Sequence, residues 1–330
     1  MSAPNLMFIF PGQGSQYVTM GTDLCDDYSI AREIYAKANE ILGFDIQSIS
    51  SNGPEEELSQ TRYTQPALLT HQIACLEIFR ELTDNAVNAD IAGGHSLGEY
   101  SALVASGMIS FEDGLRLVKR RGELMGLHGE GGMLALGLNV DEAEKLANQF
   151  YCQIASCNLP SQTVVGGVEE DLNELEAALP ELYPKKRASK LKTEGAFHTY
   201  LMVAAAREFR LELDAYEFSE GNFNVLSNYT GKMHDLDPES IRKQLFFQLF
   251  NPVQWVQCVQ KAVELGVNQV IEFGGGIGKG EIPIDKKPNL QSIMTKNLRS
   301  LGHKADYYPA INSETLRTTA EIFLSEKKKN

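Results

Sequence analysis

Residues 93–100 read Gly93-Gly94-His95-Ser96-Leu97-Gly98-Glu99-Tyr100 and place a serine between two glycines at the G-x-S-x-G spacing. This spacing is typical of a nucleophile elbow, a sharp turn between a strand and a helix that exposes a reactive serine. The surrounding sequence fits, because residues 89–92 predict a short buried strand and residues 97–106 predict a helix that ends at Gly107. N–H groups at the start of such a helix are free to bind an oxyanion. The octapeptide therefore predicts an α/β fold organised around Ser96.

The composition is that of an ordinary globular protein with a full hydrophobic core. The 330 residues are 43% hydrophobic and 22% charged, and the net charge is -14. We expect no nucleic-acid binding, since neutralising phosphates needs a basic surface. Five cysteines without a C-x-x-C pair are expected to be reduced core residues, not metal ligands. The first ten residues lack the features of a signal peptide or a membrane span, so we expect a cytoplasmic, monomeric protein with no membrane contact.

A glycine-flanked loop follows the first predicted strand. Residues 6–10 read as a buried parallel strand, and Pro11-Gly12-Gln13-Gly14 comes at its carboxyl end. Ligands gather at that edge of an open α/β sheet, and the glycines on both sides of Gln13 let its N–H turn toward a bound group. The alternative is a plain turn. A phosphate-binding Rossmann loop is excluded because Tyr17 stands at the third glycine position.

Two predicted helices carry a polar residue on a face that should be buried. The helix that opens at Thr64 is too apolar for the surface, and Gln65 at its start is either a helix cap or a ligand contact. A second helix, from Phe111 to about Met125, aims Arg121 inward. A buried arginine needs a carboxylate or phosphate partner. Arg121 is therefore either in a structural ion pair or a receptor for an anionic substrate.

Between about residues 127 and 193 the pattern changes to short alternating elements. Their order, β-α-β-β-α-β, is that of a ferredoxin-like unit with a small core of its own. We expect a discontinuous catalytic domain of residues 1–127 and 194–330, with an inserted subdomain at residues 128–193. Asn158, between the two middle strands, either lines the cleft or makes a turn, and the residue type favours the turn.

The densest basic run of this acidic chain lies in the predicted subdomain. It is either an exposed strand edge or a docking surface for a partner, and the contrast with the overall charge favours docking. Its members are Lys185, Lys186, Arg187, Lys190 and Lys192.

A serine nucleophile needs a general base, and His198 is the best placed of six histidines. It lies in Gly195-Ala196-Phe197-His198-Thr199, just before a predicted helix. His95 adjoins Ser96, but neighbours on a sharp turn point in different directions. No persuasive acid lies between the serine and the histidine, where the hydrolase order would put it. We therefore expect a Ser96–His198 dyad in which the second ring nitrogen donates to a backbone carbonyl.

Other segments carry weaker signals. Residues 47–62 are mostly polar and predict a loop, residues 291–294 predict a strand, and residues 313–325 predict a helix. The glycine-rich segment 274–280 is not a Walker A loop, because residues Phe273 and Gly280 do not fit its two ends. We expect a flexible loop near the cleft there.

Six motifs in this order resemble those of malonyl-CoA:acyl carrier protein transacylases, over about residues 6–273. The resemblance implies an α/β-hydrolase-like core with a parallel sheet, plus an inserted ferredoxin-like subdomain. The motifs are Gly12-Gln13-Gly14, Thr64-Gln65-Pro66-Ala67, Gly94-His95-Ser96-Leu97-Gly98-Glu99-Tyr100, Arg121-Gly122, Gly195-Ala196-Phe197-His198 and Asn251-Pro252-Val253-Gln254-Trp255.

The resemblance also implies catalytic roles. Ser96 would be the nucleophile and His198 its base. The backbone N–H groups of Gln13 and Leu97 would form the oxyanion hole, and the main-chain carbonyl of Gln254 would orient His198.

For substrate binding, the resemblance implies that Arg121 pairs with the malonyl carboxylate with help from Gln65, and that His95 lies near this carboxylate pocket. Phe197, directly before the histidine, resembles the bulky residue of malonyl-selective acyltransferases. It therefore favours malonyl over methylmalonyl.

The implied activity is malonyl transfer from malonyl-CoA to the phosphopantetheine thiol of an acyl carrier protein, through a malonyl ester on Ser96. No metal or bound cofactor is expected. The alternative is an acyl hydrolase or thioesterase, which would share the elbow and His198 but gain nothing from a buried Arg121. A non-catalytic module that binds carrier proteins would not need Ser96. Fatty-acid and polyketide synthesis both stay open as the pathway.

Overall fold

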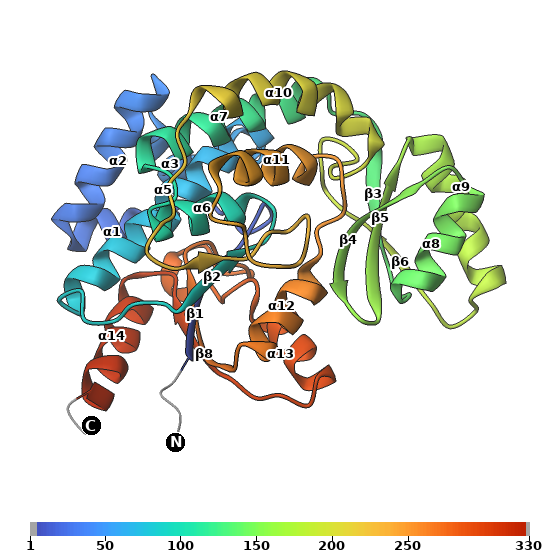
Figure 1. Cartoon of the computed structure of the whole chain (residues 1–330). Coiled ribbons are helices and arrows are strands. Elements are labelled where there is room, and N and C mark those ends of the chain that lie inside the picture. Colours follow the sequence, from blue (N-terminus) through green and yellow to red (C-terminus); the bar gives the residue numbers. More distant parts are fainter. Residues whose placement is uncertain (1–4, 328–330) are drawn as a thin grey trace.

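A five-stranded sheet in the order β7-β2-β1-β8-β9 organises the larger part of the computed structural model, which describes residues 5–327 (Figure 1). Every neighbouring pair in this sheet is parallel. The central strand β1 is buried on both faces, as its unbroken apolar run predicts. The strands are β1 (Asn5–Phe10), β2 (Ile91–Gly94), β7 (Asn224–Val225), β8 (Val267–Phe273) and β9 (Asp306–Ala310).

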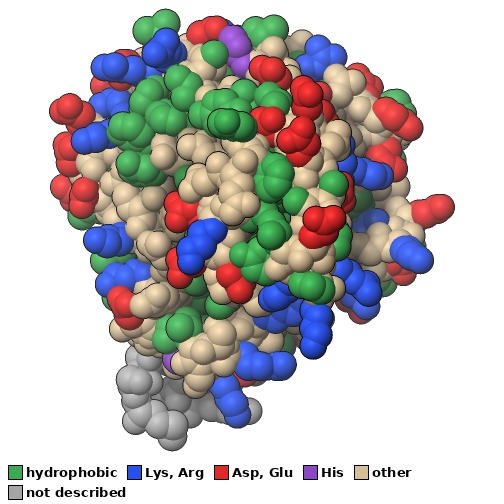
Figure 2. All heavy atoms as spheres, turned by 90° about the vertical axis from the view of Figure 1, so that its right-hand side faces the viewer, with side chains coloured by type: hydrophobic (Ala, Val, Ile, Leu, Met, Phe, Trp, Pro, Cys, Tyr) green, Lys and Arg blue, Asp and Glu red, His purple; other side chains and the backbone are tan. Residues whose placement is uncertain are grey.

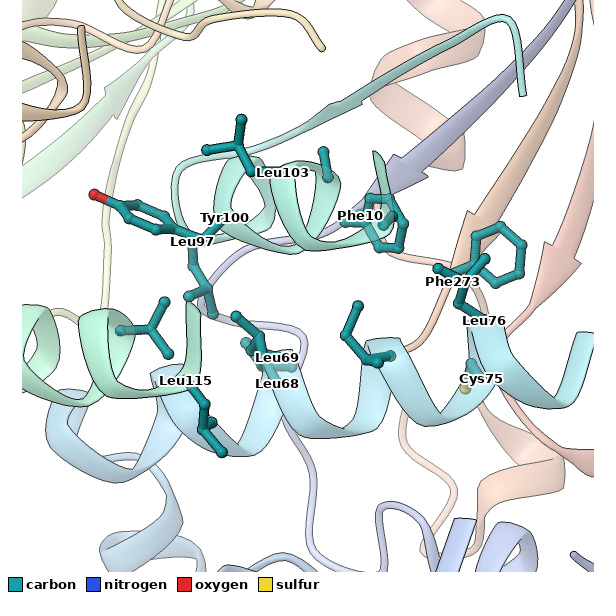
Figure 3. Packing of buried hydrophobic residues seen from close by; sticks show 14 of the residues in the cluster. Phe10, Leu68, Leu69, Cys75, Leu76, Leu97, Tyr100, Leu103, Leu115 and Phe273 are labelled. Atoms are coloured by element: carbon teal, nitrogen blue, oxygen red, sulfur yellow. The ribbon is translucent and has the colours of Figure 1, made fainter. Parts of the chain in front are cut away.

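Helices cover both faces of this sheet. Side chains alternate along β1, so Phe8 and Phe10 enter one hydrophobic core while Met7 and Ile9 enter the other. In the first core, leucines of α5 pack beneath Phe10 and the elbow helix α6 (Figure 3). Its helices are α1 (Thr22–Asp27), α2 (Ser29–Leu42), α3 (Ile46–Asn52), α4 (Glu55–Leu58), α5 (Thr61–Leu82), α6 (Leu97–Ser106), α7 (Phe111–Leu127), α10 (Val203–Ala215), α11 (Pro238–Gln248) and α14 (Ser313–Lys327). The second core is covered by α12 (Trp255–Glu264) and α13 (Gln291–Ser300).

A second, antiparallel sheet lies beside the first, at the right of Figure 1. Its strand order is β4-β5-β3-β6, and its two helices bury a separate core against it. The chain order β-α-β-β-α-β is the one predicted, and the α/β class with a ferredoxin-like unit is confirmed. The elements are β3 (Gly132–Leu136), α8 (Val140–Gln149), β4 (Gln153–Leu159), β5 (Gln162–Gly167), α9 (Glu169–Leu182) and β6 (Ala188–Lys190); two short 3₁₀ turns, η1 (Tyr200–Met202) and η2 (Pro283–Asp285), lie outside this unit.

Three local predictions are wrong. Residues 47–62 were expected to form a loop, yet they contain α3, α4 and the start of α5. Helix α5 begins at Thr61 and not at Thr64, because the carboxylate of the distant Glu194 accepts its first N–H at 2.5 Å. Residues 291–294 form the first turn of α13 and not a strand. The buried face of α13, Met294, Asn297 and Leu298, has helical spacing.

Two expectations about composition can be compared with the described residues. All five cysteines fall within residues 5–327, and each is buried without a disulfide. In the same range, none of the helices is both long enough and apolar enough to cross a bilayer.

Candidate active site

Ser96 lies on the sharp turn between β2 and α6, as the octapeptide predicts. Its backbone has a positive φ of 54° with ψ −103°, a strained geometry for a residue with a side chain and one that is concentrated at functional sites. Both glycines of the motif are required by close backbone contact. A Cβ atom on Gly94 would overlap the carbonyl of Gly98, and a Cβ atom on Gly98 would overlap the carbonyl of Phe10. The elbow is therefore held by backbone packed against backbone.

His198 is brought to Ser96 from 102 residues further along the chain. Its Nε2 lies 2.7 Å from the Ser96 hydroxyl oxygen, which is hydrogen-bond distance. Its Nδ1 lies 2.7 Å from the main-chain carbonyl oxygen of Gln248, so the ring donates from Nδ1 and accepts at Nε2. The backbone is pinned by a bond from the His198 N–H to the Leu249 carbonyl at 3.2 Å. The expected pair of serine and histidine is in place.

The carbonyl that orients His198 belongs to Gln248, and the prediction of Gln254 is wrong. Gln248 is the last residue of α11, where helical carbonyls are left without an intrahelical partner. Gln254 instead stands at the N-cap of α12, and its carbonyl accepts the Cys258 N–H at 2.9 Å. The sequence signal was available, because Asn251-Pro252 marks the stop of a helix just upstream.

The environment of His198 keeps its imidazole neutral. Burial, together with the nearby Arg121 guanidinium, lowers the pKa of His198 to about 3, against an opposing contribution from the Gln248 carbonyl. A neutral ring whose Nε2 carries a lone pair can accept the Ser96 proton. The partial negative charge at the end of α11 then favours the imidazolium that forms.

Two backbone N–H groups are available to bind an oxyanion beside Ser96. Those of Gln13 and Leu97 donate to no acceptor within residues 5–327. Leu97 is the first residue of α6, where an unpaired N–H is expected. The loop that carries Gln13 is tied to the elbow, because the His95 N–H donates to the Phe10 carbonyl at 3.0 Å. The Gln13 side chain donates to the Thr61 hydroxyl at 3.2 Å, which fixes the loop from the other side.

Arg121 is 1% exposed and points at Ser96. Its Nη1 donates to the Gln65 side-chain oxygen at 2.9 Å, and its Nη2 donates to the Ser96 hydroxyl at 3.1 Å and to the Gln248 side-chain oxygen at 3.0 Å. Its Nε has no hydrogen-bond partner in the described part of the chain, and no carboxylate there lies within ion-pair distance of the guanidinium. Of the two alternatives, a structural ion pair is therefore absent, and the arrangement fits a receptor for an anion. Gln65 contacts Arg121, as the prediction of a shared role requires.

His95 and Asn158 form a pair at the opposite side of the serine. The Asn158 side-chain oxygen accepts from His95 Nε2 at 2.8 Å and from the Ser156 hydroxyl at 2.5 Å. Asn158 therefore belongs to β4 and faces the cavity, and the favoured turn is wrong. His95 thus contacts Asn158 and Ser156. Among the described residues it makes no hydrogen bond to the Ser96 hydroxyl or to Arg121.

Phe197 forms part of an apolar wall next to the dyad. It is buried with Met133, Val164 and Met202, and the first two of these come from the second sheet. Phe197, Met133 and Val164 line the same cavity as Ser96.

A cavity of about 710 Å³ opens onto these groups. Its lining combines residues of the second sheet with residues of the loops that follow β1 and β2, and acidic Glu55 and Glu56 and basic Lys192 lie among them. A neighbouring cavity of about 550 Å³ shares Tyr17 with it and is walled by residues 276–281, so the glycine-rich segment lies next to the cleft. The site residues that line the first cavity are Gln13, His95, Ser96, Asn158, Phe197 and His198.

Sequence reasoning missed a buried polar network beneath the elbow. Asn228 accepts the Ser96 N–H at 2.6 Å and donates to the Gly94 carbonyl at 2.8 Å, so it braces the turn on both sides. Glu99 accepts from the Asn228 N–H at 2.9 Å and from His234 Nε2 at 2.7 Å. Glu99 lies in the octapeptide itself, and an acidic residue inside a buried apolar helix was a usable signal. Asn228 and His234 lie in irregular segments that carry no comparable sequence signal.

The arrangement has the parts of a nucleophilic acyl-transfer site: a nucleophile, a neutral base, two oxyanion donors and a cation. Among residues 5–327, no cluster of three or more histidine, cysteine or carboxylate side chains could hold a metal ion.

Comparisons with known proteins agree with this chemistry. A family model described as an acyl transferase domain matches residues 7–274. A malonyl CoA-acyl carrier protein transacylase of Bacillus subtilis is 36% identical over 82% of this chain and 87% of its own length. A crystal structure of the malonyl CoA-acyl carrier protein transacylase of Clostridium perfringens superposes with a TM-score of 0.87, at 30% identity, over 99% of this chain and 100% of that one. A malonyl-transacylase in complex with its type II polyketide synthase acyl carrier protein gives 0.84 at 32% identity, over 96% and 99%.

Proposed function

The chain belongs to the acyl transferase family and is a transferase of malonyl groups from malonyl-CoA to acyl carrier protein, and we propose that it works through a malonyl ester on Ser96. The observation that carries this route is the position of the Ser96 hydroxyl oxygen. It lies between His198 Nε2 at 2.7 Å and Arg121 Nη2 at 3.1 Å. A base and a cation thus meet on one nucleophile.

In the first half-reaction, His198 Nε2 takes the Ser96 proton while the hydroxyl oxygen attacks the thioester carbon. The N–H groups of Gln13 and Leu97 receive the developing oxyanion. The carbon–sulfur bond then breaks, and His198 returns the proton to the departing CoA sulfur. A thiolate leaves easily, so a histidine oriented by a carbonyl is a sufficient base.

In the second half-reaction, the phosphopantetheine thiol of the carrier protein gives its proton to His198 and attacks the Ser96 ester. The ester bond breaks, and the serine oxygen takes the proton back. Each proton in this scheme passes through His198, and the oxyanion is held by backbone groups. We therefore propose that the reaction uses no metal and no bound cofactor.

Donor selection rests on Arg121 and Phe197. A malonyl carboxylate would neutralise the buried guanidinium, whereas an acetyl group would leave it unpaired at a cost of several kcal/mol. The apolar wall at Phe197 leaves little room for a branch on the malonyl carbon. Both features favour malonyl over acetyl and methylmalonyl.

The basic run of the second sheet is the proposed docking surface for the carrier protein. Lys185, Lys186 and Arg187 are exposed and in no ion pair among the described residues, whereas Lys190 pairs with Glu169 at 2.6 Å. Lys192 lines the active-site cavity, so the run leads to its mouth. Lys and Arg side chains gather on the lower part of this side of the molecule (Figure 2).

We further propose that residues 128–193 form the subdomain and residues 1–127 and 194–330 the catalytic domain, since β3 to β6 all fall between residues 132 and 190. A monomer is sufficient for activity, because Ser96, His198 and Arg121 come from one chain.

The test is covalent labelling with radioactive malonyl-CoA, followed by denaturation. We expect one label per chain, and none in Ser96→Ala. When carrier protein is added, the label should move to the phosphopantetheine thiol of that protein. Release mainly as free malonate would support a hydrolase instead. A folded wild-type protein that takes no label would contradict the route through Ser96.

A further inference from the structure

Gln248 contacts Arg121, Glu99, His198 and the Ser96 main chain from one position. Its side-chain oxygen accepts from Arg121 Nη2 at 3.0 Å, and its Nε2 donates to the Ser96 carbonyl at 3.0 Å and to Glu99 at 2.8 Å. Its main-chain carbonyl accepts from His198 Nδ1 at 2.7 Å. The side chain has no exposed surface. One residue therefore positions the Arg121 guanidinium through its side chain and the His198 imidazole through its backbone carbonyl.

Glu99 fixes which way the Gln248 amide points. Its carboxylate is fully buried and accepts three hydrogen bonds, from the Asn228 N–H, Gln248 Nε2 and His234 Nε2. A group that receives three donors is the ionised carboxylate. His234 Nδ1 has no partner among residues 5–327, and a proton there would be a buried unpaired donor. His234 is therefore the neutral Nε2–H tautomer and leaves the charge of Glu99 in place.

The buried charges of Arg121 and Glu99 are thus opposite and separated by one amide. No carboxylate of the described chain contacts Arg121 directly, and Gln248 accepts from the cation with its oxygen while it donates to the anion with its nitrogen. Burial lowers the pKa of Arg121, and Tyr100 and Glu99 oppose this effect. This separation stabilises a buried guanidinium without placing a carboxylate of the described chain in direct contact with it.

We propose that Gln248 is a positioning residue that aligns Arg121 and His198 on Ser96 together, with Glu99 as the distant counter-charge of Arg121. The inference rests on the proposed malonyl transfer. Its consequence is that the side chain of Gln248 governs donor selectivity, while its backbone carbonyl serves every donor alike.

The first test is Gln248→Met, which keeps volume and backbone but removes both polar ends of the side chain. The matched control is Gln244→Met, one turn earlier on α11, where a buried amide donates to the Ser240 hydroxyl and has no other side-chain partner in the described range. We expect kcat/KM for malonyl-CoA to fall about 10- to 100-fold in Gln248→Met, the range for lost hydrogen bonds to charged groups, and that for acetyl-CoA to fall several-fold less. Gln244→Met should leave the ratio of the two donors unchanged.

A double-mutant cycle with Arg121→Ala separates positioning from a general structural role. If Gln248 acts through Arg121, adding Gln248→Met to Arg121→Ala should lower malonyl transfer less than about threefold further. Equal losses for the two donors in Gln248→Met, or losses that multiply in the double variant, would overturn the proposal.

Glu99→Asp covers the case in which Gln248→Met does not fold. It keeps the charge and withdraws the carboxylate from the Gln248 amide, so the malonyl-to-acetyl ratio should drop in the same direction; an unchanged ratio would overturn the proposal. The wild-type enzyme is labelled in parallel. If it forms malonyl-Ser96 while either variant gives the contradicting result, only the role of Gln248 has failed and the proposed function stands.

Discussion

Replacing Arg121 by alanine should convert a malonyl-selective enzyme into one that barely distinguishes malonyl from acetyl donors. The guanidinium is 1% exposed and meets Gln65, Gln248 and Ser96 but no carboxylate of the described chain. Its positive charge is thus available to a substrate. Arg121→Ala leaves the malonyl carboxylate in the same buried place without a partner.

The magnitude follows from the burial. Removing one member of a buried ion pair costs about 3–5 kcal/mol, and each 1.36 kcal/mol is a factor of ten in rate. We therefore expect kcat/KM for malonyl-CoA to fall by roughly two to nearly four orders of magnitude. An acetyl donor has no carboxylate and loses only the hydrogen bond from Arg121 to the serine oxygen, so it should fall about tenfold or less.

The assay is the rate of acyl-Ser96 formation from each donor without acceptor, followed by rapid quench and intact mass. Arg120→Ala is the matched control, because Arg120 is the preceding residue of α7 but is half-buried and forms ion pairs with Glu123, Glu208 and Glu212. Arg120→Ala should not change the rate of acyl-Ser96 formation from either donor. If Arg121→Ala slows both donors by the same factor, the arginine holds the site together and does not select the substrate, and the reasoning is refuted.

Three further predictions concern pH, docking and the elbow. Because the pKa of His198 is lowered to about 3, the base stays neutral and acyl-enzyme formation should be flat from pH 8 to about 5; an inflection near 6.5 in a pH–rate profile would contradict this. Reversing the charges of residues 185–187 should raise KM for carrier protein several-fold at low salt and leave acyl-enzyme formation from malonyl-CoA unchanged; equal kinetics would place docking elsewhere. Gly98→Ala should lower the free energy of unfolding by about 2 kcal/mol or more, since its methyl would overlap the Phe10 carbonyl, whereas Gly126→Ala, which meets open space, should be neutral or stabilising in the same urea titration.

Much of this site could be predicted because its residues lie next to turns and helix ends, which have recognisable sequence signals. The elbow serine has glycines on both sides, and helical spacing alone aimed Arg121 inward. The wrong carbonyl shows the limit of a motif. Gln248 and Gln254 lie in the same segment, at opposite kinds of helix end. The carbonyl of the last residue of a helix has no partner within that helix, whereas the carbonyl of an N-cap residue accepts the first intrahelical hydrogen bond. A motif does not tell which of the two positions a residue occupies.

Other features depend on contacts between distant parts of the chain. Helix α5 starts at Thr61 because Glu194, from the segment that follows the second sheet, caps it. Asn158 faces the cavity because His95 and Ser156 hold its side-chain oxygen. Local residue preference favours a turn for asparagine, and only the folded cavity overrides it.

The close approach at the elbow determines how the catalytic groups move. Gly94 touches Gly98, Gly98 touches the end of β1, and Gly12 touches the backbone of His95. The loop with one oxyanion donor and the helix with the other are consequently a single body. Thermal motion of side chains, and rearrangement of the second sheet around the cavity, can change how a donor enters, but neither can open the spacing between Gln13 and Leu97 without first separating backbones that are in contact. We expect the hydrogen-bonded backbone amides of this junction, those of His95 and Gly98, to exchange at the rate of global unfolding, well after those of the cavity rim.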